Sequence, residues 1–168
     1  MDDSEGEHLK DTPRRVATHL KDICSGYKDF DISKITTTFN SQGYDEIIIL
    51  KDINFYSTCS HHLLNFSGKV HLGYLPNKKI IGISKLARIV EIYAKRLQVQ
   101  EQMTKQIVEV VEYILKPKGV ACVVEGAHLC IQSRGVKQQN AIMITSSMRG
   151  VFRRSQAARN EFLRLIGK

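Results

Sequence analysis

The chain carries a cysteine and two adjacent histidines in one short stretch, Cys59-Ser60-His61-His62. The spacing of Cys59 and His62 lets a tight turn present a thiolate and an imidazole to the same metal ion. Two ligands do not complete a metal site, and the same histidines would also serve as an acid–base pair or as packing. The chemistry of this stretch therefore depends on which other residues converge on it.

A second group of the same residue types lies later in the chain, where His128 and Cys130 are two residues apart. We expect a strand over His128–Val136, and on a strand both side chains would face the same side of the sheet, together with Arg134. Cys130 would then supply a third metal ligand, and His128 a further histidine. Three protein ligands with an open fourth position are typical of catalytic zinc, which lowers the pKa of its bound water to about 7.

The other cysteines and histidines have simpler interpretations. Cys24 and Cys122 lie in an expected helix and an apolar strand, where a cysteine is most often a small buried hydrophobe. His8, His19 and His71 are expected to be surface or strand residues. The candidate metal chemistry is therefore confined to the two clusters.

Periodicity and turn residues indicate the elements that must position these clusters. Asp11-Thr12-Pro13 predicts a helix start, because proline is tolerated in the first helical turn, and the helix should run over residues 14–23. A connecting loop is expected over the polar residues 25–43. The later expected elements are strands over 46–56 and 69–75, a hairpin partner over 80–83, a helical stretch capped by Ser84 that breaks near Leu97-Gln98 and is ended by Pro117-Lys118-Gly119, strands over 120–125, 128–136 and 141–147, and a helix from about Ser155.

This order of elements favours an α+β fold with an antiparallel sheet, because strands joined by hairpins flank a pair of helices. We expect a leader over residues 1–10. Residues 1–43 would comprise the N-terminal helix and its connecting loop, and residues 44–168 the catalytic domain, as one functional unit.

The composition is that of one globular domain. The 168 residues are enough for one hydrophobic core, and 42% apolar with 25% charged residues is ordinary for such a domain. No apolar run reaches the roughly 18 residues of a membrane span, and the acidic start lacks the apolar segment of a signal peptide. Four cysteines are too few for a disulfide framework and fit a reducing compartment, so we expect a cytoplasmic protein with no membrane partner.

The formal net charge of +8 calls for an anionic partner, which a nucleic acid, an anionic membrane or a small polyanion would provide. Nucleic-acid binding favours a dense basic stripe interleaved with exposed aromatic residues. Tryptophan is absent, aromatic residues make up 7%, and the basic residues are dispersed. A phosphorylated small molecule explains the charge equally well, and composition alone leaves the choice open.

Several short motifs run in order along the chain from Asp11 to the C-terminus. They are Asp11-Thr12-Pro13-x-Arg15-Val16-Ala17, Cys59-x-His61-His62, the run Gly68 to Pro76, the run Ile83 to Val90, the run Arg96 to Glu101, Glu125-Gly126-x-His128-x-Cys130, Arg134-Gly135-Val136, Thr145-Ser146 and Gly150-Val151-Phe152. At these residues the chain resembles the GTP cyclohydrolase I family. Several ordered motifs across one chain are far more specific than any single pattern.

The resemblance implies zinc-dependent hydrolysis of GTP to 7,8-dihydroneopterin triphosphate and formate, the first step of pteridine biosynthesis toward folate or tetrahydrobiopterin. It also implies a role for each matching residue. The zinc ligands would be Cys59, His62 and Cys130, the proton-transfer pair His61 and His128, the triphosphate ligands Ser84, Lys85, Arg88 and Arg134, and the guanine-recognition residues Gln100 and Glu101.

Elementary chemistry agrees with these roles. GTP carries about four negative charges, and guanidinium and ammonium groups suit phosphate oxygens. Ser84 and Lys85 would lie at a helix N-terminus, where free N–H groups favour anions. Glu101 can accept two N–H bonds from the 2-amino edge of guanine. Without the resemblance, Lys85, Arg88 and Glu101 would be interpreted as ordinary solvated helix residues.

The chain departs from the family pattern at Ser60, where the family usually has glutamate, so a carboxylate beside the metal is missing. Ala141 and Met143 also replace residues that commonly carry hydroxyl groups. One alternative is therefore a catalytically impaired zinc- and nucleotide-binding paralogue. A second is a basic nucleic-acid-binding protein with a structural zinc, which the missing fourth ligand and the scattered charge disfavour.

The resemblance also implies a fold and an assembly. The family has the tunnelling, or T-fold, architecture, with a four-stranded antiparallel sheet and two antiparallel helices; here an N-terminal and a C-terminal helix would be added. It assembles as a homo-oligomer, commonly a decamer of two stacked pentameric rings, with active sites between subunits. One small sheet leaves edges that neighbouring subunits must pair or cover.

Overall fold

The computed structural model describes residues 6–28 and 35–168. The expected leader over residues 1–10 and the expected loop over residues 25–43 lie partly outside these ranges. The elements, in chain order, are α1 (Thr12–Ile23), the 3₁₀ turn η2 (Ser25–Tyr27), β1 (Thr38–Asn40), β2 (Ile48–Cys59), β3 (Asn65–Leu75), β4 (Lys79–Ile81), α2 (Ile83–Ala94), β5 (Leu97–Gln98), α3 (Gln100–Leu115), β6 (Gly119–His128), α4 (Leu129–Gln132), β7 (Met143–Gly150), α5 (Val151–Arg154) and α6 (Gln156–Ile166).

Within the described residues, the main sheet has the strand order β5-β2-β3-β6-β7. The four long strands are antiparallel neighbours, so the predicted α+β class is confirmed, and the predicted four-stranded antiparallel sheet is confirmed only for this part of a five-stranded sheet. The prediction missed β5, which adds two residues parallel to β2 by pairing Thr58 with Leu97 and Cys59 with Gln98. Two residues between two helices are too few to show a strand periodicity.

The hairpin predicted between residues 69–75 and 80–83 is wrong. β4 pairs instead with β1, in a separate two-stranded sheet that begins with Thr38 opposite Ile81. β3 is a central strand whose two edges already bind β2 and β6, so no edge is left for β4. The same pairing corrects the expected loop over residues 25–43, because residues 38–40 are a strand.

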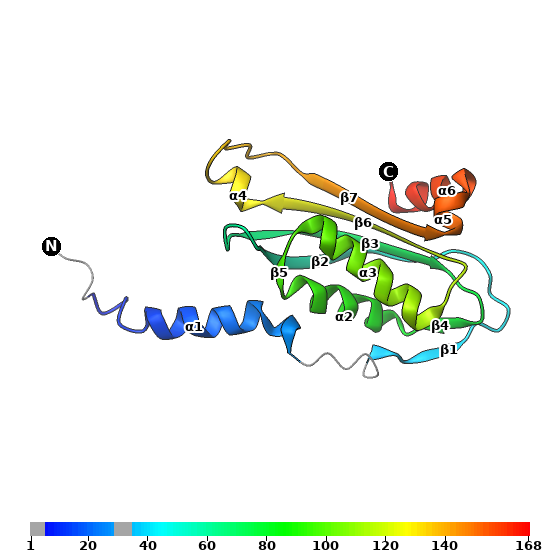
Figure 1. The fold of residues 1–168 in the computed structure, drawn as a ribbon, viewed down its shortest axis with the longest axis horizontal. Helices are drawn as coiled ribbons and strands as arrows, with labels where there is room; N and C mark the ends of the chain where they lie inside the picture. The colour runs from blue at the N-terminus through cyan, green and yellow to red at the C-terminus, as the bar shows by residue number, and fades with distance from the viewer. Residues whose placement is uncertain (1–5, 29–34) are drawn as a thin grey trace.

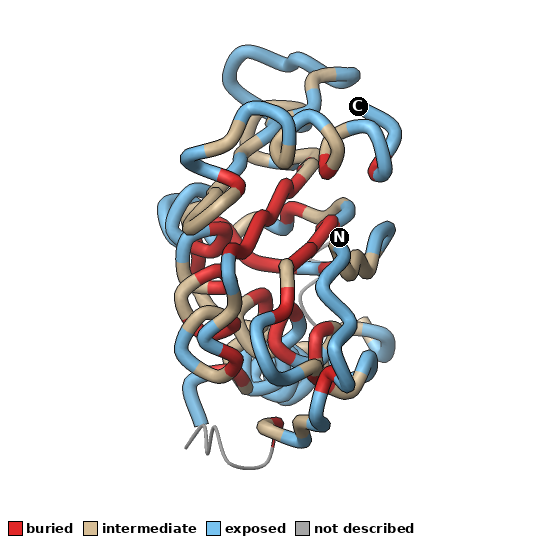
Figure 2. Tube along the Cα trace, turned by 90° about the vertical axis from the view of Figure 1, so that its right-hand side faces the viewer, coloured by how far each residue is buried: buried red, intermediate tan, exposed pale blue. Residues whose placement is uncertain are grey.

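Helices cover both faces of the main sheet, as Figure 1 shows. α2 and α3 lie over one face and enclose the larger core, which includes Phe66, Leu72 and Met103. α5 and α6 lie against the other face, where Phe152 and Phe162 form a smaller core. Figure 2 shows the buried residues gathered along the inside of these layers. α1 extends away from the sheet and has no buried residue.

The predicted helices are confirmed with small changes at their ends. The break near Leu97-Gln98 is confirmed, because β5 separates α2 from α3. Ser155 caps α6 by accepting a hydrogen bond from the N–H of Ala158. The prediction that Ser84 caps the following helix is wrong, since α2 begins at Ile83 after Gly82. In the described part of the chain, no helix is both long and apolar enough to cross a bilayer.

A pair of salt bridges fixes α3 against the edge strand β7. The guanidinium of Arg149 donates to Glu112 and to Glu109, each at 2.7 Å. Both bridges join the two elements across about one helical turn, since the carboxylates are three residues apart on α3. The N-terminus of α3, which begins at Gln100, is held over β6 and β7 separately, by hydrogen bonds from the Gln100 amide to the carbonyl oxygens of Val124 and Met143.

Candidate active site

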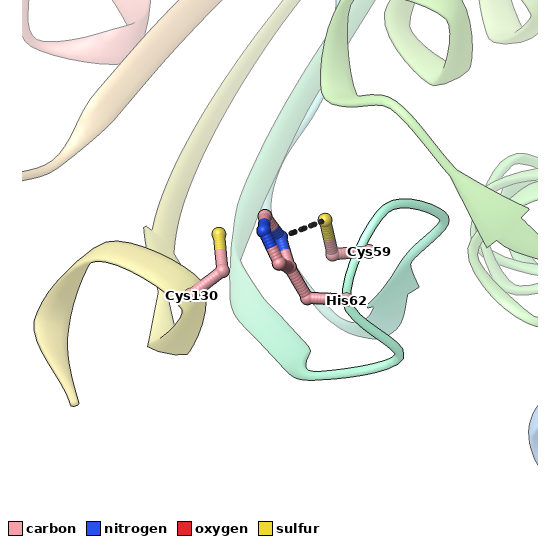
Figure 3. A group of neighbouring side chains, drawn as sticks. All are labelled: Cys59, His62 and Cys130. Atoms are coloured by element: carbon pink, nitrogen blue, oxygen red, sulfur yellow. Dashed lines mark hydrogen bonds between the residues drawn. The ribbon is translucent and has the colours of Figure 1, made fainter. Parts of the chain in front are cut away.

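Cys59, His62 and Cys130 form a compact group at one end of the main sheet, as Figure 3 shows. Their possible ligand atoms all lie within 4.8 Å of one another, and Cys59 Sγ lies 3.8 Å from His62 Nδ1. Two ligands of a tetrahedral zinc ion are about 3.6 Å apart. The two thiols and the imidazole therefore fit a zinc ion after only a small contraction.

The turn after β2 presents Cys59 and His62 to this group. Cys59 ends β2, and its N–H and C=O bond to Leu64 and Leu63 across the turn. Leu63 has a positive φ of 54°, which lets the chain reverse within a few residues. The N–H of Ser60 donates to the C=O of Gln98 at 3.0 Å and so ties the turn to β5. The Cys-x-x-His spacing thus lies on a tight turn, as the sequence predicts.

Cys130 reaches the group by a different route from the predicted one. The expected strand over residues 128–136 is wrong, because β6 ends at His128 and Cys130 lies in the short helix α4. The last pair between β6 and β7 joins Gly126 to Met143, and the last pair with β3 joins Phe66 to His128. Beyond His128 the chain has no strand partner, so it turns into a helix. The expected common strand face of His128, Cys130 and Arg134 does not exist.

The thiol of Cys130 is perturbed by its surroundings. Burial raises its pKa, the neighbouring Cys59 thiol raises it further, and the positive charge of Arg134 opposes both effects. A divalent cation would favour ionisation of the Cys130 thiol, because a metal binds the thiolate form and its charge opposes the effects of burial and of the neighbouring thiol. The donor set therefore fits a thiolate-binding metal on chemical grounds as well as on distance.

A pocket of about 220 Å³ lies beside the three-ligand group. It brings together His61, His128 and Glu101 from the predicted site. The complete lining is Cys59, His61, Gln98, Val99, Gln100, Glu101, His128, Cys130, Ile131 and Met143. Ligand pockets usually measure roughly 300–1,000 Å³, so this pocket is small for a nucleotide.

His128 is held on two sides within this pocket. Its ring stacks on that of Phe66, with centroids 4.4 Å apart and planes 7° from parallel, and its Nε2 lies 2.8 Å from Oε1 of Gln100. Burial lowers the pKa of His128, and the charge of Glu101 acts in the opposite direction. His61 lies in the turn and is exposed, with its ring edge-on to His62 at 6.2 Å. One partly buried and one exposed histidine thus face the same pocket.

The sequence did not identify Phe66 or Thr145 as parts of the site. Phe66 supplies the stacking surface for His128, and Thr145 accepts a hydrogen bond from Gln100 at 3.1 Å. A signal existed for Thr145, which lies in one of the family-like motifs. Nothing local marks Phe66, because its role depends on the pairing of β3 with β6.

The predicted triphosphate ligands do not line this pocket. Ser84, Lys85 and Arg88 lie near the start of α2, whereas the end of α2 leads into β5 beside Cys59. Arg88 lines a separate pocket of about 300 Å³ between α2 and β2. Arg134 is exposed, beyond α4, and near enough for its charge to act on Cys130. Within one chain, the metal-ligand group and the anion-binding candidates of α2 are therefore apart.

The unassigned cysteine and histidine of the sheet are structural. Cys122 is fully buried in the core, where burial raises its pKa far above the usual range. His71 is buried on β3, accepts a hydrogen bond from the N–H of Asp52 at Nδ1, and places Nε2 3.2 Å from Glu125. Cys122 therefore has the packing role that the sequence predicts, and His71 is a strand residue, although a buried one.

The fold and the site together define an α+β protein with a candidate three-ligand metal centre of the catalytic type. The model of the GTP cyclohydrolase I family matches residues 1–167. The chain belongs to the GTP cyclohydrolase I family. The resemblance found in the ordered motifs is therefore confirmed.

Curated relatives match the chain over nearly its whole length. A protein named GTP cyclohydrolase 1 from Coxiella burnetii is 50% identical over 167 residues, which are 99% of this chain and 91% of that protein. Proteins of the same name from Methylococcus capsulatus and Chlorobaculum tepidum are 48% and 47% identical, over 99% of this chain and 90% and 74% of theirs. Among solved structures, the archaeosine synthase QueF-Like in the apo form matches with a TM-score of 0.49 and 18% identity, over 62% of this chain and 93% of that chain.

Removal of the metal in air should oxidise Cys59 and Cys130 to a disulfide. Their sulfur atoms are already within 4.8 Å, and the S–S bond of about 2.05 Å is reached by a small movement of α4 or of the turn. A thiol titration of the unfolded protein should then find two fewer free thiols, and peptide mapping should find the pair. Cys24 and Cys122 should stay reduced, and an unchanged thiol count would contradict the prediction.

Proposed function

We propose that this chain is a zinc-dependent enzyme that hydrolyses GTP to 7,8-dihydroneopterin triphosphate and formate. The observation that carries the proposal is the grouping of Cys59, His62 and Cys130 beside a pocket with two further histidines, in a chain of the GTP cyclohydrolase I family. The reaction is the first step of pteridine biosynthesis, and its product serves folate or tetrahydrobiopterin synthesis. A cytoplasmic location fits a GTP substrate and free thiols.

Cys59, His62 and Cys130 would hold the zinc ion, leaving one coordination position for a small molecule. A zinc ion so bound supplies a Lewis acid and lowers the pKa of a water molecule at its open position. The chain's own contribution is to fix three ligands by β2, its turn and α4, and to shape the pocket beside them.

His61 and His128 would move the protons of the reaction. Opening the imidazole ring of guanine breaks C–N bonds, and each departing nitrogen must receive a proton. Histidine is suited to this task because its unperturbed pKa lies near neutrality. Both rings line the pocket beside the metal-ligand group, so either can reach a purine held there.

Substrate binding would use two separate sets of residues. Glu101 would accept hydrogen bonds from the 2-amino edge of guanine, with Gln100 next to it at the start of α3. Ser84, Lys85, Arg88 and Arg134 would bind the triphosphate, for which guanidinium and ammonium groups are suited. The separation of the α2 residues from the metal-ligand group and the small pocket support a site that a neighbouring subunit completes.

An open sheet supports such an assembly. β7 pairs only with β6, and β5 covers only the last two residues of β2, so both sides of the described main sheet present unpaired backbone. Exposed strand edges are normally paired or covered. A ring of chains with the T-fold would pair them, and two stacked pentameric rings would form the decamer.

A GTP turnover assay tests the proposed function. The zinc-loaded protein should release formate and form a pterin product that becomes fluorescent on oxidation. Removal of the metal with a chelator should abolish both signals, and added zinc should restore them. Binding of GTP without product would overturn the proposal and indicate the impaired paralogue, for which Ser60 would be the first cause to examine by Ser60→Glu.

A further inference from the structure

Gln100, the first residue of α3, is a buried polar side chain with all its hydrogen-bonding groups engaged. Its exposed fraction is 1%. The amide nitrogen donates toward the carbonyl oxygens of Val124 at 3.2 Å and Met143 at 3.0 Å, and toward Thr145 Oγ1 at 3.1 Å. The amide oxygen lies 2.8 Å from Nε2 of His128. No donor of this side chain is left for a purine in the described structure.

The surrounding contacts fix which end of the amide is nitrogen. Two of its neighbours are main-chain carbonyl oxygens, which only accept hydrogen bonds. The third neighbour is the hydroxyl of Thr145, which belongs to a closed ring of hydrogen bonds. The hydroxyl of Thr104 donates its hydrogen to the C=O of Gln100 at 2.7 Å. The 2.7 Å contact between Thr104 and Thr145 must therefore use the hydrogen of Thr145. The hydroxyl oxygen of Thr145 is thus an acceptor for the amide. The orientation with the amide oxygen toward His128 is the one that satisfies every partner.

The hydrogen bond to Gln100 therefore determines how the ring of His128 is oriented. Since the amide oxygen only accepts, Nε2 of His128 must carry the hydrogen. Stacking on Phe66 fixes the plane of the ring, and the bond to Gln100 fixes its rotation within that plane. Nδ1 has no hydrogen-bond partner in the described part of the chain, so it is the nitrogen left for a bound molecule.

A glycine provides the space for this contact. A Cβ atom added to Gly126 would lie 2.3 Å from the amide oxygen of Gln100 and 3.3 Å from Nε2 of His128. Any side chain at this position would displace the amide oxygen, which the other hydrogen bonds of Gln100 hold in place. The contact between Gln100 and His128 thus depends on a third residue that is neither part of the pocket lining nor a metal ligand.

We propose that the side chain of Gln100 is a positioning residue, which orients His128 for proton transfer and does not itself contact guanine. The role of His128 in proton transfer rests on the proposed function. The orientation of its ring rests on the hydrogen-bond network described above. Recognition of guanine then belongs to the side chain of Glu101, the exposed neighbour in the same pocket.

A double-mutant cycle separates orientation of His128 from binding of guanine. Gln100→Leu should lower kcat for GTP by about 10- to 100-fold and change KM by less than about threefold. In the His128→Ala background the same substitution should change neither the residual turnover nor the Kd for GTP by more than about twofold. A tenfold weaker GTP affinity in both backgrounds would assign Gln100 to the purine and overturn the proposal.

Gln106→Leu is the matched control, because Gln106 lies on the same helix, does not line the pocket, and accepts a hydrogen bond from Gln98 at 3.0 Å. Its kcat and KM should remain close to those of the wild type. Glu101→Gln should give the opposite pattern from Gln100→Leu, with the larger change in KM.

The ¹⁵N spectrum of the histidine rings tests the proposal without turnover. In the zinc-loaded protein without GTP, His128 should show a hydrogen fixed on Nε2. Both Gln100→Leu and Gly126→Ala should replace this signature by exchange between the two ring nitrogens, and Gln106→Leu should not. An unchanged His128 spectrum in Gln100→Leu would overturn the proposal. If the wild-type protein does not turn over GTP, the proposed function is refuted. The ¹⁵N spectra would still test whether Gln100 orients the ring of His128.

Discussion

Cys130→Ala should remove the bound metal and lower GTP turnover by roughly 1,000-fold or more, while the chain stays folded. The expected loss follows because a metal Lewis acid contributes several kcal/mol to the transition state, and each 1.36 kcal/mol is a factor of ten in rate. The side chain is only half-buried on the short helix α4, so little packing is lost. Elemental analysis and the turnover assay measure the two effects together.

Two comparisons make this result specific. The Tm of Cys130→Ala should lie within about 4 °C of that of the metal-free wild type, because a loss near 1 kcal/mol shifts a domain of this size by only that much. Cys24→Ala replaces a cysteine outside the site, at the end of α1, and should keep both metal and activity. Metal at the wild-type stoichiometry in Cys130→Ala would refute the ligand assignment.

Co-expression of Cys130→Ala with Arg88→Ala should restore activity that neither variant has alone. In the proposed ring with sites between subunits, the metal ligands of one chain and Arg88 of its neighbour would form one site. Random mixing of equal amounts gives both intact halves in one site out of four, so turnover should recover to about a quarter of the wild-type value. The separation of these residues within one chain is the reason for the prediction.

The measurement requires tagged chains, so that mixed assemblies are purified and their composition is determined. Mixing the separately assembled variants without subunit exchange should restore nothing and serves as the control. If mixed assemblies of equal composition stay as inactive as the single variants, each site takes its metal ligands and its α2 cation from the same chain. The proposed subunit arrangement would then be wrong.

Local sequence patterns predicted much of the secondary structure. The helical stretch that contains α2 and α3, the break between them and the start of the last helix near Ser155 are each encoded within a few turns of chain, and the structure confirms them. The tight turn that presents Cys59 and His62 is encoded in the same way. Features that depend on the propensity and spacing of neighbouring residues can therefore be predicted from the sequence.

Strand pairing and the end of β6 were not predictable from the same signals. The pattern of residues 79–81 is that of a strand, but its partner is β1, because β2 and β6 already fill the two edges of β3 that a simple hairpin would use. Cys130 lies in a helix because the sheet runs out of partners at His128. These outcomes depend on which strand edges are already paired with segments that are distant in the sequence. A short stretch of sequence does not contain that information.

The sequence by itself determined which chemistry is available to this protein: two thiols and three imidazoles in two short clusters, in the order of the GTP cyclohydrolase I motifs. Only the tertiary structure decided how these groups are arranged, with α4 bringing Cys130 to the turn and Gln100 orienting His128 through a buried amide. The physical reason is that residue type and spacing fix the chemical groups and the local turns. Distances between clusters follow instead from the packing of α3 and the pairing of β3 with β6 across the whole chain.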